Sequence, residues 1–437
     1  MTVFAKGVQA EKLSRSNSAP VDIALAERLF DELRRRTGTN RGITRTSYGL
    51  GEQIAHDMVR REAHKLGLEV KTDPGCNLYM TMKGREDGPG IFIGSHLDSV
   101  PMGGNFDGAA GVLLGLSVVS GYVLAGIRPP RDITVMAIRA EESTWFGASY
   151  IGSRSALGRL TGSELDKVKR SSDQISLGAA IDAAGGDTEF LRSGKSWLDP
   201  ENIAMFIEAH IEQGPVLVEK QIPIGIVTGI RGSFRYREAK CIGFYAHSGA
   251  TPREYRSDAV LAASALVVEL DKAWDELQAE GADLVVTFGQ FSTDASEAAF
   301  SKIAGKLSFA LDVRSQEPET LSKMQAVVSN TVTRIEAEHR VKFELGRLTD
   351  SKAAKMDEAI VSSLARLAKE HGIEAQTMAC GAGHDAAVFA DAGVPTGMVF
   401  IRNANGSHNP DEQMEIADFT EAARLVSALC LDPPLEV

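Results

Sequence analysis

Residues 91–126 read IFIGSHLDSVPMGGNFDGAAGVLLGLSVVSGYVLAG and contain an apolar run, a polar loop and a longer apolar run. The first run, IFIG at 91–94, is short and partly β-branched, which predicts a buried strand. The second run, at 111–126, predicts a largely buried helix. The loop between them holds three polar side chains among closely spaced glycines: His96, Asp98 and Asp107. A plain surface turn does not need these groups, so the loop is a candidate functional segment.

The alternation of strands and helices continues on both sides of this segment. Helical periodicity is found at 22–36, 51–66, 354–370 and 417–430, and strand-like runs at 133–140, 203–211 and 394–401. This alternation is typical of an α/β domain with a mostly parallel sheet.

The middle of the chain has a different order of elements. Strand, helix, strand, strand, helix and strand are predicted at 234–244, 257–278, 284–291, 306–313, 317–339 and 341–346. This βαββαβ order is the split, ferredoxin-like arrangement, which can fold as a unit of its own. We therefore predict a larger domain formed by residues 1–217 and 350–437, with a smaller domain, residues 218–349, inserted in it.

Composition limits the possible partners. A chain of 437 residues, with 43% hydrophobic and 24% charged residues, is typical of a globular protein of two or three domains. The net charge of -12, with no long basic run, argues against nucleic acid or an anionic membrane as the main partner. Four widely spaced cysteines, no apolar core for a signal peptide and no apolar run of ~18 residues favour a cytoplasmic protein.

Polar side chains follow or end the apolar strands of the larger domain. Four predicted strands carry them: His96 and Asp98 after 91–94, Glu141 and Glu142 after 133–140, His210 at the end of 203–211, and His408 after 394–401. In open α/β sheets, ligands bind at the carboxyl ends of the strands. Four separate segments therefore indicate one site at one edge of the sheet.

These residues form a donor set that is rich in nitrogen and oxygen and has no thiolate: His96, Asp107, Glu142, His210 and His408. Such a set suits zinc, manganese, cobalt or nickel. Two metals ~3.5–4 Å apart need a carboxylate bridge, and Asp107 stands at a suitable loop-to-helix junction. Asp98 lies two residues after His96 and can accept its second ring N–H. In the Glu141–Glu142 pair, repulsion is relieved if one binds metal and the other acts as general base.

Each of these residues has an ordinary alternative when taken alone. Asp107 could cap the following helix, His210 could be a core histidine, and Glu141–Glu142 could be a solvated turn. No function is assigned to four histidines on helical runs or at their ends: His56, His64, His339 and His371. The joint placement at strand ends favours the metal site.

Six segments resemble, in order, the motifs of a known superfamily. They are HLDSVPMGGNFDGAAGVLLGL, EESTWFGASYIGS, HIEQGPVLVEK, AHSGATPREYRSDA, GAGHDAAVFA and GSHNPDE. From about residue 45 to the end, the chain resembles the co-catalytic zinc metallopeptidases, and more narrowly their hydantoinase/carbamoylase amidase branch. That branch contains N-carbamoyl-L-amino-acid hydrolases, β-ureidopropionases and allantoate amidohydrolases.

The resemblance implies a fold and a metal centre. The fold would be a three-layer α/β/α, zinc-aminopeptidase-like catalytic domain with an inserted ferredoxin-like α+β lid that also forms a homodimer. Two divalent ions per subunit, zinc or else manganese, cobalt or nickel, would be held by His96, Asp107, Glu142, His210 and His408, with Asp107 bridging. Glu141 would be the general base, and Asp98 would orient a ligand.

The resemblance also implies substrate contacts. His247 would reach the partner's active site and polarise the scissile carbonyl, and Arg314 would clamp the substrate carboxylate. His384 and Gln213 would also contact substrate. A surface position for His247 and a structural ion pair for Arg314 are the ordinary alternatives.

Two positions depart from the family pattern. Ser301, in SKIAG, stands where the family usually has asparagine, and Ser233, in GIRGS, where it often has glutamine. A shorter hydroxyl reaches less far, so the metal chemistry looks retained while the substrate pocket looks altered.

Together these observations predict a metal-dependent amidohydrolase that cleaves the amide or ureido bond of a small N-carbamoyl or N-acyl amino acid. Ser301 and Ser233 motivate an alternative, an N-acyl amino acid hydrolase for larger acyl groups. Allantoate amidohydrolase and dipeptidase activities share the metal core. A non-enzymatic binding protein on the same scaffold is disfavoured, because Glu141 accompanies a complete ligand set.

Overall fold

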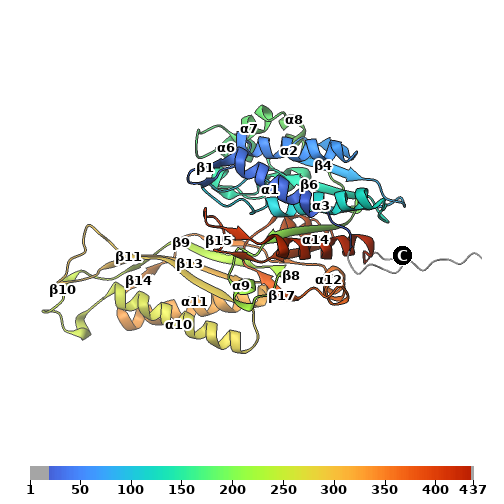
Figure 1. Cartoon of the computed structure of the whole chain (residues 1–437). Helices are drawn as coiled ribbons and strands as arrows, with labels where there is room; N and C mark the ends of the chain where they lie inside the picture. The colour runs from blue at the N-terminus through green and yellow to red at the C-terminus, as the bar shows by residue number, and fades with distance from the viewer. Residues whose placement is uncertain (1–18, 435–437) are drawn as a thin grey trace, which may run out of the picture.

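The computed structural model describes residues 19–434, in which two larger sheets organise the chain (Figure 1). The expectation that the chain lacks a signal peptide rests mainly on residues 1–18, which lie outside the described residues. Within residues 19–434, no helix combines the length and the apolar character needed to cross a bilayer.

The larger sheet has nine strands in the order β16-β8-β18-β7-β5-β6-β4-β3, with β17 beside β8. The strands are β3 (Glu69–Thr72), β4 (Leu78–Met82), β5 (Gly90–His96), β6 (Ile133–Ile138), β7 (Ile203–Ile211), β8 (Ile224–Ile230), β16 (Ala354–Lys355), β17 (Ala375–Cys380) and β18 (Thr396–Ile401). The central strands β18, β7, β5 and β6 are parallel. The expectation of a mostly parallel sheet holds for these four strands and for the β8–β17 pair, whereas β4 and β8 run antiparallel to β6 and β18.

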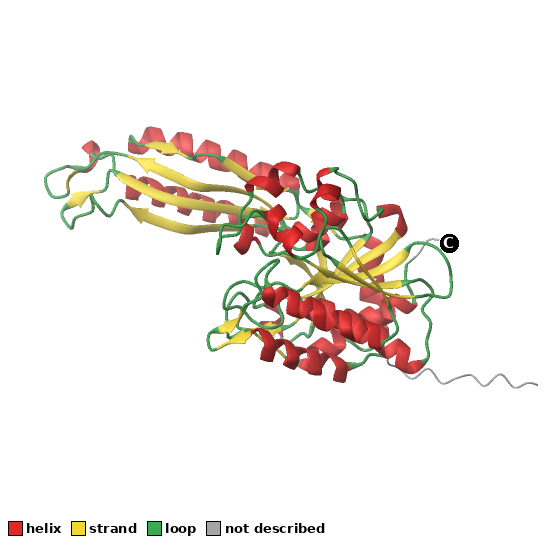
Figure 2. Ribbon diagram, turned by 90° about the horizontal axis from the view of Figure 1, so that it is seen from above, coloured by secondary structure: helices red, strands yellow, loops and turns green. Residues whose placement is uncertain are grey.

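Helices cover both faces of the larger sheet (Figure 2), which confirms the predicted three-layer α/β/α architecture. One face carries α1 (Ile23–Thr37), α2 (Leu50–Lys65), α3 (Ala109–Ala125), α12 (Glu358–Glu370) and α14 (Ile416–Leu431). The other carries α5 (Ile151–Ala156), α9 (Val216–Lys220) and α13 (Asp385–Asp391). Shorter elements complete this part: α4 (Ser143–Phe146), α6 (Gly162–Lys167), α7 (Leu177–Ala183), α8 (Thr188–Arg192), β1 (Gly38–Thr39), β2 (Gly42–Ile43), β19 (Asn403–Ala404) and β20 (Gln413–Met414).

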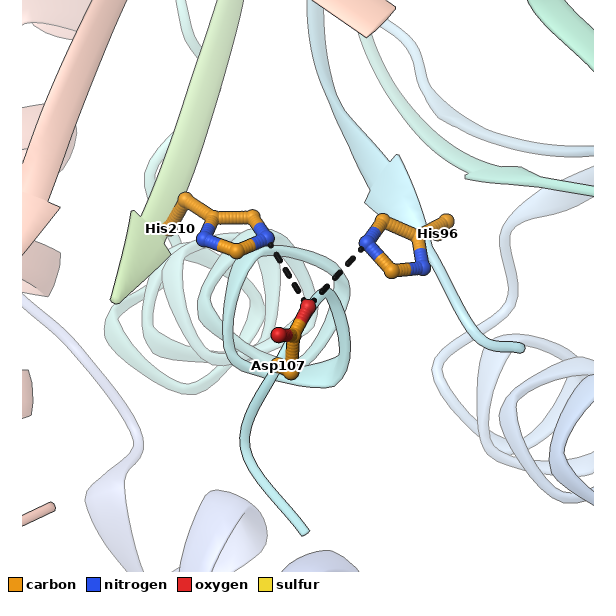
Figure 3. Close-up of side chains that lie close together, drawn as sticks. All are labelled: His96, Asp107 and His210. Carbon is orange, nitrogen blue, oxygen red and sulfur yellow. Dashed lines mark ion pairs between the residues drawn. The ribbon is translucent and has the colours of Figure 1, made fainter. Parts of the chain in front are cut away.

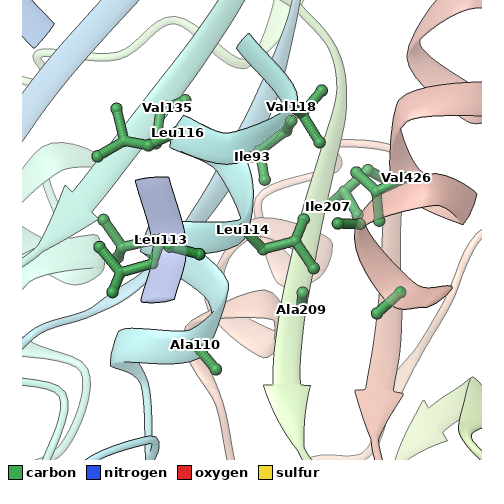
Figure 4. Packing of buried hydrophobic residues seen from close by; sticks show 14 of the residues in the cluster. Ile93, Ala110, Leu113, Leu114, Leu116, Val118, Val135, Ile207, Ala209 and Val426 are labelled. Atoms are coloured by element: carbon green, nitrogen blue, oxygen red, sulfur yellow. The ribbon is translucent and has the colours of Figure 1, made fainter. Parts of the chain in front are cut away.

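Helix α3 forms the centre of the core that the opening segment predicts. Its apolar residues occur on all sides, which is typical of a helix buried all round. Leu114 packs among residues of neighbouring strands and of α14, including Ile93, Ile207 and Val426 (Figure 4). The loop between β5 and α3 is therefore fixed at both ends by buried structure.

The smaller sheet is antiparallel and has the strand order β11-β13-β9-β14, with β15 beside β9. Its elements are β9 (Gly232–Ile242), α10 (Ala259–Ala279), β11 (Val285–Thr293), β13 (Lys306–Ser315), α11 (Pro318–His339), β14 (Lys342–Glu344) and β15 (Leu348–Ser351). Helices α10 and α11 cover one face, and the short strands β10 (Ala246–His247) and β12 (Lys302–Ile303) form a separate pair (Figure 1). The βαββαβ order expected from the sequence is observed, with β15 as an addition.

Two strands near the ends of the predicted insertion, residues 218–349, belong to different sheets. Strand β8 lies inside the predicted insertion 218–349, yet it pairs with β18 and β17 in the larger sheet. Its sequence, IGIVTGI, is apolar and almost wholly buried, which suits a strand covered on both faces. The smaller sheet begins at Gly232 and ends with β15 at Ser351.

Buried His56 should make the folded protein less stable at acid pH. Its ring is fully buried on α2, and within residues 19–434 neither ring nitrogen has a hydrogen-bond partner. Burial lowers the pKa of His56 well below its usual value, and the nearby Arg139 and Arg60 charges lower it further. In the unfolded chain His56 takes up a proton near pH 6.5, whereas in the folded chain it stays neutral at that pH. The free energy of unfolding therefore decreases as pH falls below about 6.5.

We expect His56→Leu to remove part of this acid sensitivity, up to ~1.4 kcal/mol per pH unit below pH 6.5. The measurement is the urea unfolding midpoint of metal-free protein at neutral and mildly acid pH. His64→Leu, at an exposed position of the same helix, is the matched control. An equal acid shift in wild type and His56→Leu would show that this histidine does not set the dependence.

Candidate metal centre

The structure brings the five predicted ligands together at the carboxyl ends of adjacent strands. Strands β18, β7, β5 and β6 are neighbours in the larger sheet, and each donor residue lies on or just after one of them: His408, His210, His96 with Asp107, and Glu142. These are the strand ends at which an open α/β sheet places a ligand site.

Asp107 is shared by two groups of donor atoms. In the first group its Oδ1 lies 3.4 Å from Nε2 of His96 and 3.3 Å from Nε2 of His210 (Figure 3). In the second group its Oδ2 lies 3.6 Å from Nε2 of His408, which is itself 3.5 Å from Oε1 of Glu142. Each carboxylate oxygen thus faces a different group, as a carboxylate that bridges two metals must.

Hydrogen bonds fix how the two buried histidines point. Nδ1 of His96 lies 3.1 Å from Oδ1 of Asp98, and Nδ1 of His210 lies 2.9 Å from the carbonyl oxygen of Ile211. When Nδ1 donates to these oxygens, the lone pair is on Nε2, which faces Asp107. Both rings therefore present the nitrogen that a metal would use.

Asp98 does more than orient His96. It also accepts the backbone N–H groups of Glu141 and Glu142, at 3.1 and 3.2 Å, and the hydroxyl of Ser47 at 2.6 Å. One buried carboxylate thus fixes a histidine and both glutamates relative to each other. The sequence predicts the contact with His96 but not the other three, since Ser47 and the backbone of Glu141–Glu142 have no fixed spacing from Asp98.

Residues near the C-terminal end of the described chain form hydrogen bonds to the loop that carries Asp107. Oε1 of Glu412 accepts the backbone N–H of Phe106 at 2.8 Å and that of Asp107 at 3.2 Å. The Ser407 hydroxyl lies within hydrogen-bond distance of Oδ2 of Asp107 and, at 2.8 Å, of Oε2 of Glu412, and its single hydrogen can be donated to either. No sequence signal singled out Glu412, because its partners lie some three hundred residues away. Gln213, expected to contact substrate, donates to Oδ2 of Asp107 at 2.8 Å.

The ordinary alternatives for Asp107 and for Glu141–Glu142 do not match the structure, whereas His210 is buried as a core histidine would be. Helix α3 begins after Gly108 without a side-chain cap, so Asp107 is not its capping residue. Gly108 has a φ of 65°, and a Cβ there would lie 2.5 Å from the His96 ring, so only glycine fits. Glu141 and Glu142 are only 7% and 6% exposed, which excludes a solvated turn.

The carboxylates of the site are electrostatically crowded. Burial raises the pKa of Glu141 well above its usual value, and Glu142 adds to the effect although His96 opposes it. Burial and the Asp107 charge raise the pKa of Glu142 to about 8. Burial also disfavours the charge of Asp107, but His210 and His96 lower its pKa well below the usual range. Divalent cations would relieve this repulsion, and the N/O donor set fits them.

A cavity of about 760 Å³ opens onto the donor atoms. Glu141 lines it, with Oε2 3.9 Å from Nε2 of His96, and belongs to neither donor group. His384 lines it too, is 2% exposed, and has its ring centre 4.3 Å from that of His210. Among the described residues, neither ring nitrogen of His384 has a hydrogen-bond partner, although both are buried.

Arg314 also lines the cavity, on the side formed by the smaller sheet. Its Nε and Nη2 donate to Oδ2 of Asp312 at 3.1 and 2.7 Å, and its Nη1 donates to the carbonyl oxygen of Gly381 at 2.6 Å. A guanidinium has more N–H groups than these bonds use, so donors remain for a ligand.

Three predicted substrate contacts lie outside this cavity. Ser233 is buried, and its hydroxyl pairs with that of Ser351 at 2.8 Å, because the unexpected strand β15 covers it. His247 lies on β10, and Ser301 lies next to the β10–β12 pair, at the end of the smaller sheet remote from the larger one (Figure 1). Residues that sequence reasoning missed, Tyr150, Arg235 and Arg237, line the cavity instead.

Most of the chain is similar in sequence to known hydrolases. Residues 92–432 match peptidase family M20/M25/M40. The chain is 32% identical to an N-carbamoyl-L-amino acid amidohydrolase of Geobacillus stearothermophilus, over 85% of this chain and 88% of that protein. It is 29% identical to an allantoate amidohydrolase of Escherichia coli (strain K12), over 89% and 92% of the two chains.

The fold is similar to that of solved structures. A hydantoinase/carbamoylase family amidase from Burkholderia ambifaria superposes with a TM-score of 0.83 at 28% identity, over 94% of this chain and 97% of that one. The superposition covers so much of both chains that the two sheets both belong to the shared fold.

Loss of the shared carboxylate should abolish both metal positions, whereas loss of an outer ligand should affect one. We expect about two divalent ions per wild-type chain, about one in His408→Ala and almost none in Asp107→Ala. Elemental analysis after dialysis against zinc measures this. Asp411→Asn, at an exposed position near His408, is the control. Full metal content in Asp107→Ala would contradict the bridging role.

Proposed function

The chain belongs to peptidase family M20/M25/M40, and we propose that it is a metal-dependent amidohydrolase acting on the amide or ureido C–N bond of a small N-carbamoyl or N-acyl amino acid. Two of its relatives are named for the hydrolysis of N-carbamoyl-L-amino acids and of allantoate, which are linear, non-peptide C–N substrates. The observation that carries the proposal is the position of Glu141 in the cavity, beside two donor groups that share Asp107.

Two divalent ions would be held by the groups that share Asp107, and zinc, manganese, cobalt or nickel suits these donors. Bound there, such ions polarise a carbonyl group and acidify water. His96 and His210 present Nε2, and Glu142 and His408 supply the donors on the other side of Asp107.

Glu141 is the proposed general base. Its carboxylate lines the cavity outside both donor groups, while the Asp98 carboxylate fixes its backbone. A buried carboxylate with a raised pKa holds a proton more readily than an exposed one. In the proposed reaction Glu141 takes a proton from the attacking water and passes it to the leaving nitrogen.

Two further side chains would hold the substrate. His384 offers ring nitrogens without partners among the described residues, and burial with the nearby His210 lowers its pKa well below the usual value. A neutral ring of this kind can donate to or accept from the scissile group. Arg314 has donors left for the substrate carboxylate, which the remaining N–H groups can bind.

We propose that a second copy of the chain supplies His247. The residue is exposed and lies outside the cavity of its own chain. Three large apolar side chains in the segments around β10 and β12 are strongly exposed: Phe244, Tyr255 and Phe300. Exposed apolar groups gathered in this way are typical of an interaction surface. A homodimer formed through the smaller sheet and its flanking segments would cover them.

Glu141→Gln should fold and bind metal but lose activity by about 10²- to 10⁴-fold in kcat, because the amide cannot move the proton. The readouts are kcat on N-carbamoyl and N-acyl amino acids and metal content by elemental analysis. Glu201→Gln, at an exposed position outside the cavity, is the control. Wild-type turnover in Glu141→Gln would reject this mechanism.

Mixed dimers test the source of His247. His247→Ala and Glu141→Gln subunits, co-expressed with different affinity tags, should form heterodimers that regain activity absent from either parent. The reason is that one site then combines an intact Glu141 with an intact His247 from the other chain. If His247 served its own chain, neither site of the heterodimer would be complete and no activity would return.

A further inference from the structure

The face of the smaller sheet that lines the cavity is strongly basic. Along β9 and β13 alternate residues point to opposite faces. Phe234, Leu311 and Val313 belong to the apolar core under α10 and α11. The opposite face carries four charged residues that line the cavity: Arg235, Arg237, Asp312 and Arg314.

Asp312 is the single carboxylate that this face contributes to the described cavity lining, and two of the arginines share it. Nε of Arg235 lies 3.2 Å from Oδ1 of Asp312, and the Arg314 guanidinium bonds to Oδ2. These contacts hold both side chains in place. The single negative charge of Asp312 does not neutralise the two positive charges of Arg235 and Arg314. The electrostatic potential at this face of the cavity is therefore positive even without Arg237.

Arg237 is the third arginine, and within residues 19–434 its side chain makes no hydrogen bond and no ion pair. It lies two residues after Arg235 on β9, so both point to the cavity side of the sheet. Its side chain is exposed, which means that a ligand could bind it without breaking an existing contact. A guanidinium in this state is suited to a carboxylate.

We propose that Arg237 binds a second anionic group of the substrate, so that the preferred substrates are N-carbamoyl or N-acyl derivatives of acidic amino acids. This inference rests on the proposed function and narrows it. Arg314 takes the carboxylate next to the scissile nitrogen, and Arg237 takes the side-chain carboxylate. A cavity of about 760 Å³ is within the size range that accommodates small-molecule ligands, so it has room for such a dicarboxylate.

Steady-state kinetics with matched substrates test the inference. N-carbamoyl-L-aspartate and -glutamate are compared with N-carbamoyl-L-asparagine and -glutamine, which have nearly the same shape without the charge. We expect wild type to favour the acidic member by about ten- to a hundredfold in kcat/KM, the range of a charge-assisted hydrogen bond. Added salt should reduce the preference, because Arg237 is exposed.

Arg237→Gln should bring kcat/KM for the acidic substrates down toward that for the amides, with a much larger loss on the acidic substrates than on the amides. Arg347→Gln is the matched control, since Arg347 is exposed on the same unit, lies outside the cavity and, within residues 19–434, makes no side-chain hydrogen bond or ion pair. A wild-type enzyme without acid preference, or an equal loss on both substrate types in Arg237→Gln, would overturn the inference and leave the proposed function standing.

Binding separates this inference from the proposed function. Calorimetry on metal-loaded Glu141→Gln compares the affinity for N-carbamoyl-L-aspartate with that for N-carbamoyl-L-asparagine. A preference for the acidic ligand that disappears on adding Arg237→Gln supports the second anion site even where wild type turns over neither compound. Equal affinities for both ligands would reject the site, whereas absent turnover of every N-carbamoyl and N-acyl amino acid would reject the proposed function.

Discussion

Repulsion among buried carboxylates is the constraint on which the rest of the site depends. Asp107, Glu141 and Glu142 stand together with little access to water, and the fold meets their charge from several directions. Histidine nitrogens face Asp107, and backbone N–H groups point at Asp98 and Glu412. Behind them the fully buried Arg45 donates from Nε to the carbonyl oxygen of Leu97 at 2.7 Å and places a fixed positive charge near Asp107.

The two sheets line the cavity with side chains of opposite charge. The larger sheet contributes strand ends rich in carboxylates and histidines, which suit cations, and the smaller sheet contributes arginines, which suit anions. A molecule with a polar amide at one end and a carboxylate at the other would therefore lie across the gap in one direction only. The division follows from topology: parallel strands gather their ends at an edge, whereas an antiparallel sheet with helices on one face leaves its other face free.

The site residues that the sequence predicts are those that directly follow or end a recognisable strand. His96, Glu142, His210 and His408 could be placed near one another because each follows an apolar strand, and parallel neighbours share an edge. Ser233 could not be placed, because β15, which covers it, was not recognised as a strand. Glu412 was missed for a similar reason: its role depends on a contact between distant segments, and such contacts leave no period or spacing in the chain. The same holds for β8, whose apolar run is equally compatible with either sheet until its pairing is known.

The bond from Arg314 to the carbonyl oxygen of Gly381 has a consequence for the molecule as a whole. Arg314 belongs to the smaller sheet, and Gly381 follows β17 of the larger one, so this 2.6 Å contact joins the two. The same guanidinium faces the cavity. A carboxylate bound to Arg314, as proposed, would therefore lie beside a direct contact between the two sheets, and any coupling between binding and the position of the sheets would act equally in both directions.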